Sequence, residues 1–210
     1  MVVSQLSWIA AGIPERVSHI AAFRAEYIAA LQLRVEVQRH NRVMQTSNAA
    51  AALTRLFSEL IDGPDVESAG PGAFVLNTGD VGLLRSLDKL SAADASRSMN
   101  GGATIAAHGQ HLRYGLSLMN RWAAEGGNPF ADARWDEAWK TAAVNDAEWE
   151  AIRNGLGHES RRWLRALGSP RTVDEIEFTG IVASIAHLAY HIGAIRQINK
   201  DARGPREGTF

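Results

Sequence analysis

Cysteine is absent from the 210 residues of this sequence. Its absence excludes disulfides, iron–sulfur clusters, thiolate zinc sites and cysteine nucleophiles. A metal ion would therefore have to be held by histidine, aspartate, glutamate or water. Any thiol chemistry would need a thiol supplied from outside the chain.

The sequence also lacks an excess of charge of either sign, and it lacks long hydrophobic runs. The sequence has 22 Lys and Arg against 23 Asp and Glu, for a formal net charge of −1. This balance gives no argument for nucleic acid or an acidic membrane surface as a partner. No apolar run is judged long enough to span a bilayer, and residues 2–13 lack the basic start of a signal peptide. We therefore predict a cytoplasmic protein that contacts neither nucleic acid nor membrane.

Strand patterns are missing, since no segment alternates apolar and polar residues between turn signals. Apolar residues recur instead at helical spacing. The sequence thus predicts an all-α protein, a bundle of about four principal helices with an extra N-terminal helix. The predicted longer helices cover about residues 15–41, 48–61, 104–125 and 145–167, and a last helix from Thr179 to about Lys200.

Turn and capping signals divide the chain between these helices. Ser91 with Asp94, and Asn145 with Glu148, form capping boxes, and Asp80 is expected to cap a short helix that reaches Leu90. Residues 128–144 are rich in aromatic side chains but have no clean period. We interpret this segment as a packed loop with a short helical turn, whose tryptophans form a wall over the bundle.

Four of the seven histidines form two pairs at helical spacing. His187 and His191 are four residues apart, which places them one turn apart on one helix face, where they can bind one metal ion. His108 and His111 share a face of another helix, so either can supply a third ligand. Three protein ligands plus water is the arrangement of a reactive metal site. The other three fall off the apolar stripes and are expected at the surface: His19, His40 and His158.

Other side chains near the pairs are candidates for a substrate pocket. Arg113 and Arg196 are close to the histidines in sequence and are suited to an anionic substrate. Trp122 falls on the same helix face as His111. Metalloprotease, carboxylate-bridged di-iron and phosphate-loop motifs are absent. The predicted pocket residues are His108, Arg113, Trp122 and Tyr190.

Two segments together resemble the DinB/YfiT-like family of four-helix-bundle metalloproteins. They are Ile105-Ala-Ala-His108-Gly-Gln-His111-Leu-Arg-Tyr and Ala186-His187-Leu-Ala-Tyr-His191-Ile-Gly-Ala-Ile-Arg-Gln, and the resemblance covers about residues 49–200. In that family one histidine of the second bundle helix and the His-x-x-x-His of the fourth hold the metal. The resemblance implies His111, His187 and His191 as ligands, because the family's histidine precedes an apolar residue, as His111 does. His108 would then lie beside the ligands.

The resemblance also implies a function. Members include metal-dependent transferases that use a low-molecular-weight thiol such as bacillithiol or mycothiol, and a homodimer is expected. A His₃-bound Zn²⁺, Ni²⁺ or Fe²⁺ lowers the pKa of bound water or binds a thiol as thiolate, which suits a chain without cysteine. We therefore expect a metal-dependent transferase acting on a small molecule. The alternatives are a metal-dependent hydrolase, or a non-enzymatic binding or stress-response bundle.

The N-terminal region departs from the family pattern. Members usually begin near the first bundle helix, which here starts soon after Met44. We therefore predict an N-terminal helical extension over residues 1–43, which the native product does not necessarily include. The bundle itself is expected over 44–203, followed by a C-terminal tail over 204–210.

Overall fold

The computed structural model describes residues 49–65 and 72–205 of the chain. The chain divides into two compact units, residues 1–48 and 49–210, and the description below concerns the second. The predicted helix over 15–41, together with His19 and His40, lies outside the described residues. The proposed boundary at Met44 stays a prediction.

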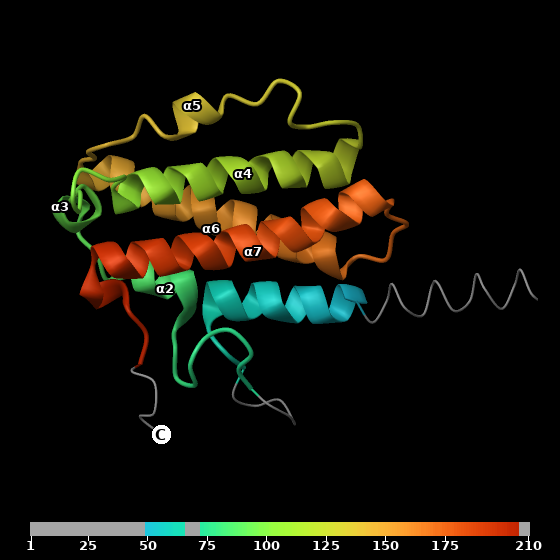
Figure 1. Ribbon diagram of the computed structural model, residues 1–210, viewed down its shortest axis with the longest axis horizontal. Coiled ribbons are helices and arrows are strands. Elements are labelled where there is room, and N and C mark those ends of the chain that lie inside the picture. The colour runs from blue at the N-terminus through green and yellow to red at the C-terminus, as the bar shows by residue number, and fades with distance from the viewer. Residues whose placement is uncertain (1–48, 66–71, 206–210) are drawn as a thin grey trace, which may run out of the picture. The chain divides into compact units, whose positions relative to one another are not determined.

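All regular secondary structure in the described part of the chain is helical, which confirms the all-α prediction. Figure 1 shows the long helices α4, α6 and α7 running alongside one another, with α5 in a long connection outside α4. Helix α4 contacts both α6 and α7. The elements in chain order are a helix over 49–62, α2 (Gly82–Asp88), α3 (Ala92–Ala95), α4 (Ile105–Glu125), α5 (Trp135–Ala138), α6 (Asp146–Gly168), α7 (Glu175–Ile198) and a 3₁₀ turn (Lys200–Ala202).

The core is formed by the apolar stripes of the long helices. Trp149 and Trp163 of α6 and Leu188 and Ile195 of α7 are at most 2% exposed. Burial of side chains of this size contributes about 1.5–3 kcal/mol each, so these stripes hold the bundle together. At Gly109 an added Cβ would lie 3.1 Å from the Ile152 side chain, so α4 and α6 pack closely at that point.

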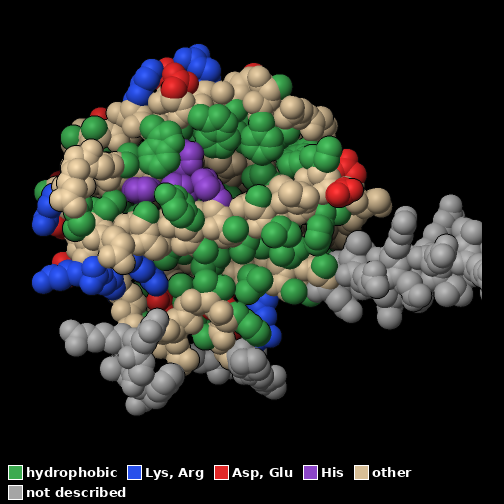
Figure 2. Space-filling model, in the orientation of Figure 1, with side chains coloured by type: hydrophobic (Ala, Val, Ile, Leu, Met, Phe, Trp, Pro, Cys, Tyr) green, Lys and Arg blue, Asp and Glu red, His purple; other side chains and the backbone are tan. Residues whose placement is uncertain are grey.

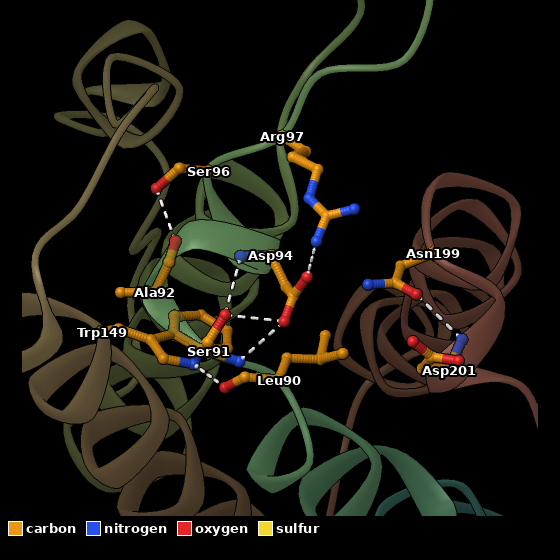
Figure 3. Close-up of polar contacts among 9 residues, drawn as sticks. All are labelled: Leu90, Ser91, Ala92, Asp94, Ser96, Arg97, Trp149, Asn199 and Asp201. Carbon is orange, nitrogen blue, oxygen red and sulfur yellow. Dashed lines mark hydrogen bonds and ion pairs between the residues drawn. The ribbon is translucent and has the colours of Figure 1, made fainter.

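Most helix boundaries follow the predicted signals. In Figure 3 the Ser91 side chain accepts the Asp94 backbone N–H at 3.1 Å, and the Asp94 carboxylate accepts the Ser91 N–H at 3.2 Å. Asn145 and Glu148 form the same reciprocal pair at the start of α6. Helix α4 ends where Gly126 takes a positive φ of 71°, a conformation that favours glycine. Capping therefore fixes where α3, α4 and α6 begin or end.

The predicted start of the last helix at Thr179 is wrong. Helix α7 begins at Glu175, and the Asp174 side chain accepts the Glu177 backbone N–H at 2.8 Å. Thr179 lies inside the helix, where its hydroxyl donates to the Glu175 carbonyl. Asp174 is a capping residue, and the two glutamates after it favour the positive end of the helix dipole. This start signal lies one turn before the predicted one.

The short helix α2 also differs from its prediction. Asp80 accepts the Gly82 backbone N–H at 2.9 Å, but Val81 occupies the cap position and the helix ends at Asp88 rather than Leu90. Asp80 has a second role, because its carboxylate pairs with Arg196 of α7 at 2.8 Å. The Asp80 side chain is 1% exposed, so this ion pair ties α7 to the start of α2.

Helix α7 is apolar on most of its circumference. Its 24 residues contain an 18-residue window of mean hydropathy 1.4, so by length and composition it is able to cross a bilayer, contrary to the sequence-based exclusion. A core helix of a globular bundle passes the same test. One face of α7 is buried in the bundle, through Ile181, Ile185, Leu188 and Ile195. One third of the apolar window is buried in this way, so α7 is partly a core element, and the cellular location stays a prediction.

Candidate metal centre

Two neighbouring helices bring the four paired histidines together. His108 and His111 lie on α4, His187 and His191 lie on α7, and rings from one helix contact rings from the other. His108, His111 and His191 are 8%, 6% and 2% exposed, whereas His187 is only partly buried. The predicted placement of each pair on one helix face is confirmed. The cluster is therefore internal, with His187 as its most accessible member.

Three of these histidines converge through their ring nitrogens. The His187 Nε2 atom lies 3.1 Å from the His111 Nε2 atom and 2.8 Å from the His191 Nε2 atom. One ring nitrogen from each of the three lies within 4.8 Å of the other two. Two imidazole nitrogens bound to one ion at about 2.0–2.1 Å are roughly 2.9–3.4 Å apart, for angles from octahedral to tetrahedral. The two contacts of His187 lie in or close to this range, and the three histidines are near enough together to bind one metal ion.

The group contains histidine alone. It is the one set of three or more His, Asp or Glu side chains, among the described residues, that is close enough to hold an ion. No carboxylate of the described part belongs to it, so an ion bound there keeps its full positive charge. Three histidines close together and able to bind a metal were predicted from the sequence, and the structure confirms that proximity.

His108 occupies a different place from the other three. Its Nδ1 atom lies 2.8 Å from the Nδ1 atom of His191, whereas the Nε2 atom of His191 faces His187. One of the two Nδ1 atoms must donate a proton to the other. A metal-binding histidine usually hydrogen-bonds through its second ring nitrogen, and this bond fixes its orientation. Of the two candidates on α4, His111 belongs to the converging group, and His108 contacts His191 through the nitrogen that faces away from His187.

Burial keeps the imidazoles neutral. It is the main cause that lowers the pKa of all four histidines, because the charged form loses hydration. The pKa of His111 falls to about 4 and that of His191 to about 3, since neighbouring histidines oppose a further positive charge. Neutral imidazole is the metal-binding form. The cluster is thus ready to bind an ion at neutral pH without first losing protons.

Tryptophans of the α5 segment cover the cluster. The ring of Trp139 stacks on His111 at 4.2 Å between centroids and 23° between planes, and Trp135 lies 5.4 Å from the same histidine. The Nδ1 atom of His111 is buried without a hydrogen-bond partner, so stacking on Trp139 orients this ring. The predicted wall over the bundle is therefore present, and it touches the histidines.

The aromatic contacts continue away from the cluster. Trp135 stacks on Phe130 at 6.3 Å, and Phe130 contacts Trp122 at 5.7 Å. We call Trp122, Phe130, Trp135 and Trp139 the aromatic wall. Trp122 lies at its far end against Gly180 of α7, where an added Cβ would come within 2.5 Å of the indole. The sequence drew attention to Trp122, but Trp135 and Trp139 contact the histidines. The sequence did contain a signal for these two tryptophans, because their separation of four residues places them on one face of a helical turn.

The remaining predicted pocket residues are spread around the site. The Tyr190 ring lies 5.0 Å from His191 and is 69% exposed. Arg113 lies against α6, where a Cβ on Gly155 would be 2.4 Å from its Nε atom. Arg196 pairs with Asp80. Both arginines therefore have contacts elsewhere in the bundle, and nothing in the structure supports their predicted role in receiving an anionic substrate. His158 is exposed, as expected.

Comparisons of the chain with protein-family models, with curated proteins and with solved structures found no match. The resemblance to the DinB/YfiT-like family therefore still rests on the two histidine segments. What the geometry itself establishes is a helical bundle with three converging histidines.

The contact between His108 and His191 gives a test of the assignment on α4. His108→Ala should weaken zinc binding about 10–100-fold, the usual effect of removing a partner of a metal ligand, while one ion per chain still binds at saturation. Competition with a chromophoric chelator measures the affinity, with the exposed His158→Ala as control. Complete loss of the ion in His108→Ala, with little effect of His111→Ala, would reverse the assignment.

Proposed function

We propose that the protein binds one divalent metal ion through His111, His187 and His191, and that it is a metal-dependent transferase acting with a low-molecular-weight thiol. The observation that carries this proposal is the convergence of three Nε2 atoms in a buried cluster of neutral histidines. Imidazole suits Zn²⁺, Ni²⁺ and Fe²⁺ alike, so all three are candidates. The DinB/YfiT-like bundle type, a homodimer and a cytoplasmic location belong to the same proposal.

The ligand set favours a reactive site over a structural one. Structural zinc sites are closed by four protein ligands, whereas three protein ligands leave a position for water or substrate. His187 is partly exposed, which gives an external ligand access to that side. When bound, the ion supplies Lewis-acid activation of a thiol or of water. Because the three ligands are neutral, an anionic thiolate is a favourable fourth ligand.

The chain's own side chains hold the ligands rather than move protons. His108 orients His191 through the Nδ1 contact, and Trp139 orients His111 by stacking. Trp139 also contacts His108 and His191, so it covers three of the four histidines. The metal group of the described residues includes no carboxylate to serve as a general base. With no carboxylate in this group of described residues, the ion itself would have to activate the nucleophile, and the preference for a thiol rests on the resemblance of the two histidine segments to the DinB/YfiT-like family.

The test compares reactions with and without thiol. Full-length protein loaded with Zn²⁺, Ni²⁺ or Fe²⁺ is assayed with a panel of electrophiles, with and without added bacillithiol, mycothiol or 2-mercaptoethanol. Thiol consumption that needs both the loaded ion and an electrophile supports a transferase. Turnover in water alone would indicate a hydrolase instead. A loaded protein inactive with every electrophile, in the presence and absence of thiol, would favour a binding bundle.

A further inference from the structure

Three of the four residues of the aromatic wall are unusually exposed for side chains of their size, whereas Trp122 is partly buried. Phe130, Trp135 and Trp139 are 38%, 36% and 38% exposed, although Trp149 and Trp163 show that the same bundle buries tryptophan almost completely. In Figure 2 hydrophobic side chains border the histidines on the face drawn. Apolar surface of this kind next to a few convergent polar groups is typical of a ligand site.

The wall is fixed on α4 rather than loosely placed. The Tyr114 hydroxyl accepts the Arg134 backbone N–H at 2.8 Å, and Arg121 pairs with Asp132 at 2.7 Å. Trp135 packs over Gly115 of α4, where a Cβ would lie 3.8 Å from the indole, at ordinary van der Waals distance. A surface held from several points loses little conformational entropy when a ligand covers it.

Positive charges near the wall already have partners. Arg121 pairs with Asp132, and Arg134 and Lys140, which flank α5, both pair with Glu137. An anionic group on the part of a substrate that lies against the wall would compete with the carboxylates of these pairs and would meet apolar rings. The wall instead offers flat apolar faces, on which neutral aromatic groups stack favourably.

We propose that the site accepts a substrate that carries a neutral aromatic or similarly flat apolar group, and that the aromatic wall binds this group beside the metal ion. The inference rests on the proposed metal site and adds to it the chemical class of the substrate. It replaces the anionic substrate expected from Arg113 and Arg196, because both arginines contact other parts of the bundle.

A pair of matched probes tests the inference on the full-length, zinc-loaded protein. Benzohydroxamate and acetohydroxamate carry the same metal-binding group and differ only in a phenyl against a methyl. Calorimetry should give a Kd for benzohydroxamate that is lower by about tenfold, the effect expected for stacking of one ring. A carboxylated aliphatic hydroxamate should bind no more tightly than acetohydroxamate.

Variants then assign the phenyl preference to the wall. In Phe130→Ala/Trp135→Ala, which keeps Trp139 stacked on His111, the preference should fall to about twofold or less with acetohydroxamate unaffected. Phe74→Ala, an exposed aromatic outside the wall, should keep the full preference. Equal Kd values for the two probes in the wild type, tighter binding of the carboxylated probe, or an unchanged preference in the wall variant would each overturn the inference. The zinc content is measured separately and tests the metal site itself. A protein that holds no zinc would contradict the proposed function, whereas a zinc-loaded protein without the phenyl preference would contradict only the substrate class.

Discussion

Replacing both His187 and His191 by alanine should abolish metal binding and leave the helical fold in place. Elemental mass spectrometry of the zinc-reconstituted wild type should give about one ion per chain, and the double variant close to none, since only one of three ligands remains. The loss of affinity should exceed the 10–100-fold expected for a partner outside the ligand set. This is the largest effect expected from any substitution in the chain.

The fold should survive because neither position is needed to build α7. Alanine favours helix more than histidine does, and the apolar stripe through Ile181, Ile185, Leu188 and Ile195 is untouched. Far-UV circular dichroism of the metal-free variant should match that of the metal-free wild type. His158→Ala on exposed α6 surface is the matched control, and it should bind one ion. Wild-type protein that takes up no Zn²⁺, Ni²⁺ or Fe²⁺, or a double variant that still binds one ion, would contradict the assignment.

The ligand set illustrates what helical spacing determines and what it does not. Spacing of three or four residues places two histidines on one face of one helix, and this was enough to pair His187 with His191. It leaves open which of His108 and His111 on α4 reaches them, because both lie on the same face. That choice depends on the crossing of α4 over α7 and on ring rotation, which only the structure supplies: His111 meets His187 and His108 meets the far side of His191.

Local sequence signals predicted the helix ends more accurately than they predicted the contacts of the long connection that contains α5. The capping boxes at Ser91 and Asn145 act through atoms at most three residues apart, so the sequence contains all the information that fixes them. The α5 segment is held by distant contacts instead, such as the bond from the Arg134 N–H to Tyr114. Its tryptophans could be predicted to cover the bundle, but not to stack on His111, because that contact joins residues 28 positions apart in sequence.

The pairing of Arg196 with Asp80 shows the same limit for charges. In sequence, Arg196 is five residues from His191, close enough for a predicted role beside the histidines. In the structure its guanidinium lies 2.8 Å from a carboxylate contributed by residue 80, and that carboxylate also accepts the N–H of Gly82. A buried charge requires a partner, so the interior pair determines where the arginine lies. Sequence proximity to a site is therefore weak evidence for a role in it.

Acid should destabilise the metal-free protein over a defined pH range. The folded-state pKa values of His111 and His191, about 4 and about 3, lie below the value near 6.5 of an unfolded chain. Between these limits the unfolded state binds more protons than the folded state, so the free energy of unfolding falls as the pH falls. The stability should be constant above about pH 7 and decrease progressively from about pH 6.5 to 4.

The size of this decrease follows from the pKa shifts of His111 and His191. The expected value is reduced because solvent at the exposed side of the cluster screens the charges. We expect about 2 kcal/mol in total, or roughly 4–8 °C in Tm for a chain of this length. Thermal unfolding of chelator-treated protein at pH 7.5 and pH 5 measures it. In His111→Gln/His191→Gln the difference should shrink, because the groups that must stay neutral are gone, whereas His158→Ala should retain it. Equal pH dependence in the glutamine variant and the wild type would show that other groups cause the loss. A confirmed dependence would mean that burial in the folded protein keeps these imidazoles unprotonated. The same burial would then leave their ring nitrogens available to a metal ion rather than to a proton.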